Sequence, residues 1–370
     1  DGSGNKAAYT STSAKTLQSQ WTTVGVARFS DAASDFNHIV FGPNDTPYVA
    51  YRDRENNDAV TVQVFSGSSW QTLGATGDSA GEGPNSSSNM ALAVTADGTP
   101  YVAFTDKKNS ERGTVLEYSG SWQVLGGGPF SAEGAYDLSM AVDSKGTLYV
   151  AYTDYGTTNN KLTVRKYDGS WQTVGSAGFS GGGATASDIS ISSKDIPYVV
   201  YTDGDNGSEA TVQKYDGGWN TVGAAGFTPN VANEPEIALD SSDRVYVAYI
   251  DGDTSSRITV QRYDEGADTW STLGSSDISG QFAEYPEIVL NSGDIPYVVF
   301  SDRENPDNIR KATVKRYESA SDRWEIVGTA GFSAEEAYST DIALDSNDTP
   351  YVVYRDLVNT SYELTVKKYE

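Results

Sequence analysis

The chain has no cysteine and a single histidine among its 370 residues. Without cysteine there is no disulfide framework and no thiolate metal site. One histidine excludes multi-histidine metal centres, and a Ser-His-Asp triad could draw only on His38. Basic residues are scarce as well, because 26 Lys and Arg stand against 51 Asp and Glu, a net charge of −25. Nucleic acid and membrane surfaces require a basic face, so we expect neither as a partner.

What is abundant is glycine, serine, threonine, asparagine and aspartate, with only 2 methionines. This composition is common in exported bacterial proteins, so we expect a secreted or surface-displayed protein. No apolar run approaches the length of a membrane span, and we expect no membrane insertion. Residues 1–20 are polar and rich in serine and threonine, which predicts a tail. The remaining residues, 21–370, are expected to form one domain.

A unit of about fifty residues recurs seven times, a period typical of repeat folds. Each unit contains a short apolar run, then PYVAY or a variant ending on aspartate, then T-V-x-x-[YF], then tryptophan. The runs alternate with period two and are bounded by turn formers, which predicts strands; we name them a, b, c and d in that order. The tryptophans of strand d are spaced 48 to 54 residues apart: Trp21, Trp70, Trp122, Trp171, Trp219, Trp270 and Trp324.

Seven units of four strands predict an all-β fold, a seven-bladed β-propeller, with a β-solenoid as the alternative. The last unit ends after strand c at Tyr369, whereas Trp21 precedes any strand a. We therefore predict that residues 21–25 supply strand d of the seventh blade and close the ring, which hides two exposed edges. The PYVAYxD phrase resembles the repeats of bacterial YVTN and kelch-like extracellular propellers over nearly the whole chain. That resemblance implies an architecture and carries no activity.

Most aromatic residues recur at one register and are predicted to pack between blades. Six tyrosines fall outside the repeat pattern, five of them in loops, where they could stack on a sugar ring or pack against the loop. The candidates for ligand binding are Tyr136, Tyr285 and Tyr338. These d–a and b–c loops share one face of a propeller and hold most of the acidic residues. Acidic loops could simply favour solubility, or they could bind a divalent cation.

Two groups of acids are the candidate cation ligands. Asp203, Asp205 and Glu209 alternate in one b–c loop at a spacing similar to that of an EF-hand, although the closing glutamate is missing. Asp188, Glu236 and Glu287 stand one residue before the apolar position of strand a, and Asp341 and His38 take the same position in other units. Because strand a lines the central channel, these carboxylates are expected to repel one another unless Ca²⁺ or Na⁺ neutralises them. The aspartate that ends every strand b is instead predicted to cap a turn.

One seam departs from the repeat. Arg52 and Arg355 precede the recurrent aspartate where the other units carry Thr, Ile or Ser. The two units are neighbours through ring closure, and His38 and Asp341 belong to the same seam. The two arginines could share a carboxylate or sulfate of a ligand, or they could pair with Asp53, Asp356 or Asp341.

These features favour a monomeric, non-catalytic extracellular binding module that binds a glycan or protein through its acidic loop face, with Ca²⁺ as the candidate cofactor. A carbohydrate-active enzyme, a polysaccharide lyase or a glycosidase with its site at the seam, is the second hypothesis. A spacer domain in a larger surface protein is the third. No paired catalytic motif is present, which favours a role without catalysis and leaves the enzyme hypothesis open.

Overall fold

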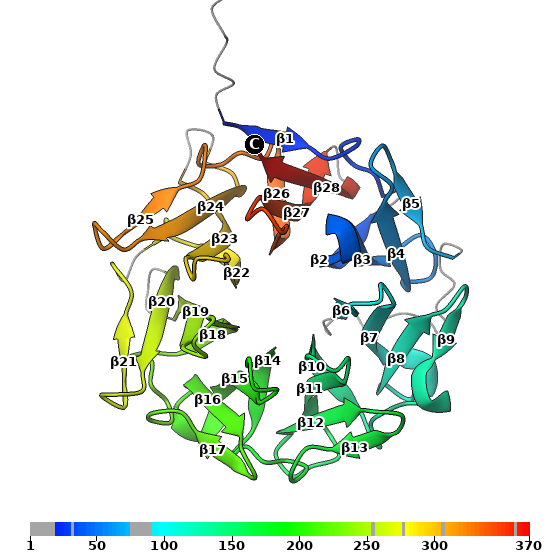
Figure 1. Ribbon diagram of the computed structural model, residues 1–370, viewed down its shortest axis with the longest axis vertical. Helices are drawn as coiled ribbons and strands as arrows, with labels where there is room; N and C mark the ends of the chain where they lie inside the picture. Colours follow the sequence, from blue (N-terminus) through cyan, green and yellow to red (C-terminus); the bar gives the residue numbers. More distant parts are fainter. Residues whose placement is uncertain are drawn as a thin grey trace, which may run out of the picture.

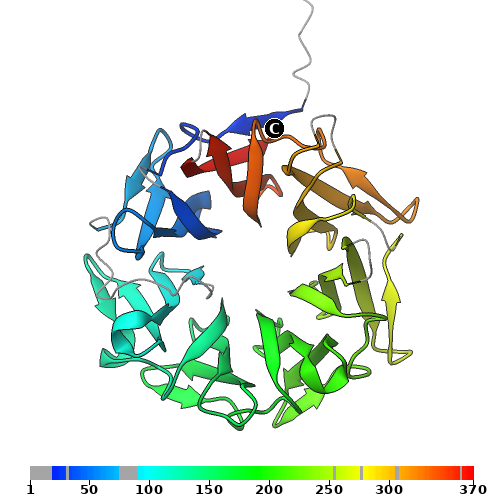
Figure 2. The ribbon, with the colours of Figure 1, turned by 180° about the vertical axis from the view of Figure 1, so that it is seen from behind.

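The computed structural model describes residues 19–30, 33–74, 90–252, 256–275, 278–304, 308–358 and 361–370. It contains seven antiparallel four-stranded sheets arranged as blades around a central channel (Figure 1). The same ring is seen from behind in Figure 2, with strand a of each blade innermost and strand d outermost. The predicted seven-bladed propeller is therefore confirmed. No helix among the described residues is both long enough and apolar enough to span a bilayer.

The strands of blades 1 to 4, in the order a, b, c, d, have the following bounds. They are β2 (Ser34–Gly42), β3 (Thr46–Asp53), β4 (Ala59–Phe65) and β5 (Trp70–Thr72); β6 (Ala91–Val94), β7 (Pro100–Asp106), β8 (Arg112–Tyr118) and β9 (Trp122–Val124); β10 (Ala135–Val142), β11 (Leu148–Asp154), β12 (Lys161–Tyr167) and β13 (Trp171–Thr173); β14 (Ala184–Ile191), β15 (Pro197–Asp203), β16 (Glu209–Tyr215) and β17 (Trp219–Thr221).

Blades 5 to 7 follow in the same order. They are β18 (Ala232–Leu239), β19 (Val245–Asp251), β20 (Arg257–Asp264) and β21 (Thr269–Thr272); β22 (Glu284–Leu290), β23 (Pro296–Asp302), β24 (Lys311–Glu318) and β25 (Arg323–Ile326); β26 (Glu336–Leu344), β27 (Pro350–Val358), β28 (Ser361–Tyr369) and β1 (Trp21–Thr23). Short 3-10 turns occur at η1 (Pro43–Asp45), η2 (Lys107–Asn109), η3 (Leu125–Gly127) and η4 (Gly204–Asn206).

The N-terminal strand closes the ring, as the repeat count predicts. β1 pairs antiparallel with β28, with Trp21 opposite Tyr369. Gln20 and Glu370 exchange two backbone hydrogen bonds just beyond that pair, at 2.7 and 3.1 Å. The strand ends at Thr23, shorter than the predicted 21–25, and Gly25 follows with a φ of +73°, a conformation that suits glycine.

The seven tryptophans join the blades to one another. Each indole nitrogen donates a hydrogen bond to the backbone carbonyl three residues after the tryptophan of the preceding blade. Trp21 follows the same rule at the closing seam, where it donates to Val327 at 2.9 Å. The other six pairs are Trp70 with Val24, Trp122 with Leu73, Trp171 with Leu125, Trp219 with Val174, Trp270 with Val222 and Trp324 with Leu273. This ring of bonds explains why tryptophan recurs at one register.

Apolar packing between blades completes the core. The phenylalanine of the d–a loop stacks on the tryptophan of the next blade, as Phe179 does on Trp219 with centroids 3.8 Å apart. Phe332 stacks on Trp21 in the same way at 4.1 Å, so the closing seam has the packing of an ordinary one. The tyrosines that end strand b, such as Tyr201 and Tyr354, are fully buried. The predicted structural role of the recurrent aromatics is confirmed.

Aspartates link neighbouring blades on the face opposite the long loops. At five seams, the aspartate of an a–b turn accepts hydrogen bonds from the backbone N–H and the hydroxyl of a serine in the preceding blade. The pairs are Ser144 with Asp195, Ser193 with Asp243, Ser241 with Asp294, Ser292 with Asp348 and Ser346 with Asp45. Bonds from Lys145 and Ser144 lower the pKa of Asp195 to about 2.

Candidate functional site

A β-bulge shapes the mouth of the channel at the start of strand a. In blade 1 the register shifts between Asp35 and His38, so that two residues lie opposite one residue of β3. The first residue of the bulge has a positive φ, between 45° and 56°, in all six blades where it is described. These residues are Phe36, Asp137, Ala186, Glu234, Tyr285 and Ser339. The bulge turns this part of strand a toward the mouth on the loop face.

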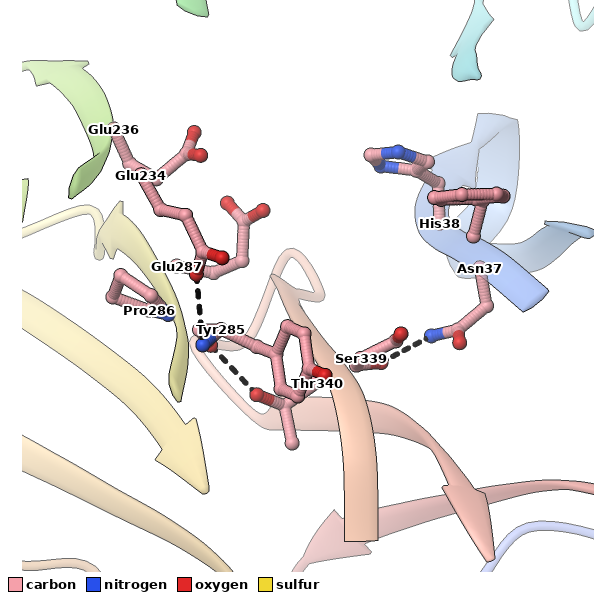
Figure 3. A pocket seen from close by; sticks show the side chains of 10 residues that line it. Asn37, His38, Glu234, Glu236, Tyr285, Pro286, Glu287, Ser339 and Thr340 are labelled. Carbon is pink, nitrogen blue, oxygen red and sulfur yellow. Dashed lines mark hydrogen bonds between the residues drawn. The ribbon is translucent and has the colours of Figure 1, made fainter. Parts of the chain in front are cut away.

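A pocket of about 230 Å³ lies at this mouth, beside blades 1, 5, 6 and 7. Figure 3 shows its wall of acidic residues, Glu234, Glu236 and Glu287, with His38 and Asn37 on the opposite side. The remaining lining residues are Phe36, Tyr285, Pro286, Ser339 and Thr340. The lining therefore combines carboxylates and hydroxyls with aromatic and proline surface.

Asn37 has an unfilled acceptor in this pocket. Its side-chain amide donates to the Ser339 carbonyl at 2.7 Å (Figure 3). The residue is only 4% exposed, and its Oδ1 atom is buried without a hydrogen-bond partner among the described residues. A buried acceptor without a partner is costly. Because this atom has almost no accessible surface, a ligand donor could satisfy it only after the Asn37 amide shifts toward the pocket.

The other polar atoms of the pocket brace one another. The backbone N–H of Tyr285 donates to Glu234 at 3.1 Å, and the Thr340 hydroxyl donates to the Tyr285 carbonyl at 2.7 Å (Figure 3). These bonds hold Tyr285 against blades 5 and 7. The predicted loop tyrosine is thus part of the pocket.

A second, smaller cavity of about 150 Å³ shares His38, Glu236 and Glu287 with the first and adds Asp188. Burial raises the pKa of Glu236 well above its usual range, and the charges of Glu287 and Asp188 raise it further. Burial, then Asp341 and Asp188, act in the same direction on the pKa of Glu287. The acids at this register are therefore brought together in the channel, where they oppose one another's ionisation.

Asp188 and Asp341 are occupied by neighbouring blades. Asp188 accepts from the Ser139 hydroxyl at 2.5 Å and from the backbone of Ile237 in the next blade at 2.9 Å. Asp341 accepts from the backbone of Ile39 across the closing seam at 2.8 Å, and its Oδ2 atom lies 3.4 Å from Nδ1 of His38. These two aspartates therefore connect blades as well as carrying charge.

The two seam arginines do meet, but around a residue of the protein itself. Arg355 Nη2 lies 2.7 Å from Asp35 Oδ1, and Arg52 contacts the other oxygen of the same carboxylate. Arg54 also bonds to Asp35, whose side chain is buried. The expected partners Asp53, Asp356 and Asp341 are therefore wrong for these arginines, because the bulge brings Asp35 opposite Arg52. The place predicted for a ligand anion holds the Asp35 carboxylate.

The b–c loop predicted to bind a cation, with Asp203, Asp205 and Glu209, uses its first aspartate for local hydrogen bonds. Asp203 accepts from the Asp205 backbone, the Asn206 amide and the Thr211 hydroxyl, at 3.1, 2.9 and 2.8 Å. Asp53, Asp106, Asp154 and Asp302 cap their turns in the same way, which confirms the predicted capping role in these blades. Asp356 is an exception, because it lies inside β27 and contacts Thr365 and Arg28.

The rest of that loop lies apart. The Asp205 carboxylate lies against Gly182 of the neighbouring d–a loop, and Glu209 lies against Gly226. Among the described residues no three His, Asp or Glu side chains are grouped so that they could hold a metal ion. Metal binding by Asp188, Glu236, Glu287, Asp203, Asp205 and Glu209 stays a prediction.

The other two loop tyrosines do not line the pocket. Tyr136 packs against Tyr155 with centroids 4.4 Å apart, and its hydroxyl bonds to Glu111. Tyr338 donates to Glu336 at 2.7 Å and lies under the Arg310 guanidinium. For both residues the ordinary loop packing is what the structure contains.

Seven contributors to the site are absent from the sequence-based prediction: Asp35, Phe36, Asn37, Glu234, Pro286, Ser339 and Thr340. All lie on the bulge at the start of strand a, or directly before it in the case of Asp35. Position relative to the apolar residue of strand a is the signal that could have found them. To use that signal, one has to know that the bulge interrupts the alternation of inward and outward side chains at the start of strand a.

Comparisons with known proteins support the architecture. No protein-family model matches the chain, and no curated protein does. Among solved structures it is similar to a protein of unknown function from Dyadobacter fermentans, with 12% identity and a TM-score of 0.53 over 95% of this chain and 98% of that one. It is also similar to an ulvan lyase of a new polysaccharide lyase family, with 11% identity and a TM-score of 0.58 over 92% and 94%.

A third similar structure is a puromycin-hydrolysing peptidase from Mycobacterium tuberculosis, with 12% identity and a TM-score of 0.55. The match covers 93% of this chain but 55% of that protein. At such identities these likenesses show a shared fold, and function must be argued from the site.

Proposed function

We propose that the protein is a non-catalytic binding module that receives the end of a glycan in the pocket at the channel mouth. The observation that carries this proposal is the cavity of about 230 Å³ itself, in which carboxylate and hydroxyl side chains stand beside the ring of Tyr285. The lining is rich in acceptors, which match the hydroxyl groups of a sugar. Tyr285 and Phe36 add aromatic surface of the kind that packs against a sugar ring.

The size of the pocket limits the ligand. Pockets for drug-sized ligands start at about 300 Å³, so this one suits a single sugar ring entering end-on, with the rest of the chain on the loop face. The lyase with a similar fold acts on a polysaccharide according to its name, which agrees with this ligand class at the level of fold. An extracellular bacterial location and a monomeric state belong to the same proposal.

Glycan-array screening tests the proposal, followed by titration calorimetry with any hit, with and without Ca²⁺. Tyr285→Ala should weaken binding of the hit at least tenfold, because it removes the aromatic wall. Tyr155→Ala is the matched control, since this tyrosine is 52% exposed on the same face and does not line the pocket. Binding that depends on Tyr155 and not on Tyr285 would contradict the pocket, and an empty array would contradict the function.

Acid–base catalysis on a sugar is a second candidate function. It is favoured by the position of His38, whose Nδ1 atom lies 3.4 Å from Asp341 Oδ2, and by the raised pKa of the neighbouring Glu236 and Glu287. In this case His38→Gln should abolish turnover of the array hit while leaving its affinity unchanged. Absence of any product after prolonged incubation with wild-type protein would leave the binding module as the only account.

A further inference from the structure

The acidic wall of the pocket has no basic counterpart. Glu234, Glu236 and Glu287 line it, and among the described residues no lysine or arginine does. Its one basic residue, His38, lies next to Asp341. The nearest arginine cluster is neutralised in part by Asp35, outside the lining. The pocket therefore presents carboxyl groups, and no lining lysine or arginine, to whatever enters it.

Glu236 and Glu287 differ from the aspartates at the same register. Asp188 and Asp341 each accept a backbone bond from the following blade. The glutamates are one methylene longer. The Glu236 carboxyl shares a hydrogen bond with Asp188, whereas no described residue donates a hydrogen bond to the Glu287 carboxyl. Two adjacent, half-buried carboxyls in this state either keep a proton or are neutralised by a cation.

The shape of the pocket distinguishes between kinds of cation. The described residues contain no group of His, Asp or Glu with the arrangement of a metal site. A bare ion would also leave the aromatic and proline surface of Phe36, Tyr285 and Pro286 uncovered. An ammonium group on a ring supplies three N–H donors and no acceptor, and the ring can cover that surface.

We infer that the sugar unit held at the channel mouth carries a free ammonium group, so that the ligand class is a glycan with a non-acetylated amino sugar. This inference rests on the proposed function. The ammonium lies between Glu236 and Glu287, and the ring lies against Tyr285. Hydrogen bonds to charged groups are worth about twice those between neutral ones, so selectivity for the charged sugar follows.

Calorimetric titration at pH 6 with three tetrasaccharides tests the inference: a glucosamine tetramer, its fully N-acetylated form and a glucose tetramer. We expect the glucosamine tetramer to bind about tenfold more tightly than the other two. Glu236→Gln with Glu287→Gln should remove that preference. Glu133→Gln, an exposed acid of the same loop face, is the matched control and should change affinity less than twofold.

Other outcomes overturn the inference in distinguishable ways. Equal or tighter binding of the acetylated or glucose tetramer, still lost in Tyr285→Ala, would remove the ammonium and leave glycan binding in place. Binding of ethanolamine alone, with no tetramer bound, would overturn both the sugar and the proposed function. A rise in melting temperature with Ca²⁺ that the double Gln variant lacks would assign the site to a metal. Melting curves of all variants show whether each is folded.

Discussion

Removal of the Asp35 carboxylate should destabilise the closing seam strongly. Asp35 is 4% exposed and contacts Arg52, Arg54 and Arg355, of which Arg52 is 3% exposed. In Asp35→Asn the side chain keeps its shape and loses its charge, which leaves two largely buried guanidinium groups without their common counterion. Breaking a buried ion pair from one side costs about 3–5 kcal/mol.

That cost can be converted into a melting temperature. The entropy of unfolding is about 2.1 cal/mol/K per residue, or roughly 0.8 kcal/mol/K in total for 370 residues. A loss of about 4 kcal/mol then lowers the melting temperature by about 5 °C. Arg54→Gln removes only the outer partner, whose side chain is 48% exposed. It should cost less than about 1 kcal/mol, and so lower the melting temperature by about 1 °C.

Differential scanning calorimetry of the wild type, Asp35→Asn and Arg54→Gln measures both effects. Asp35→Ala adds a further check, because it vacates a carboxylate-sized space between two arginines that formate or acetate should fill, with a rise in melting temperature. Two results together would refute the reasoning: a melting temperature of Asp35→Asn no lower than that of Arg54→Gln, and no effect of formate on Asp35→Ala. The buried arginines would then not need this carboxylate as a counterion. The anion site predicted from the sequence would then deserve a renewed test with sulfate.

Two further predictions concern the fold. Deleting residues 1–25 should lower the melting temperature or cause aggregation, because it removes β1 with Trp21, a side chain worth about 4–6 kcal/mol of gross apolar burial. Deleting residues 1–18 should have little effect. Similar melting curves for the two truncations would contradict ring closure by β1. The pKa of Asp195 is lowered to about 2 in the folded state from its usual 3.8, so its contribution to stability is present above about pH 4 and is lost as the pH falls through 2. The difference between the melting temperatures of wild type and Asp195→Asn at pH 5 should shrink toward pH 2 and vanish below it. A constant difference would mean that the aspartate does not titrate with folding.

The fold was predictable because its packing repeats. Tryptophan at 21 and no tryptophan after Tyr369 identified the clasp, and the structure places Trp21 in the same bond and stack as its six counterparts. Repetition also placed Glu236, Glu287 and His38 in the channel. What repetition could not supply is the bulge: its first residue is Phe, Asp, Ala, Glu, Tyr or Ser in different blades. No composition marks such a position, so Asn37 and Asp35 were missed.

At the bulge, the backbone conformation of strand a is independent of the side chain. A non-glycine residue in the left-handed region costs roughly 1–2 kcal/mol, and six blades accept it at Phe36, Asp137, Ala186, Glu234, Tyr285 and Ser339. Because the backbone takes this shape whichever side chain it carries, the residue at this position can change one blade at a time on an unchanged scaffold. At Phe36, Glu234, Tyr285 and Ser339, glycine would relax the backbone and also remove a side chain of the pocket lining. The mouth of the channel therefore combines a fixed backbone shape with side chains that vary from blade to blade.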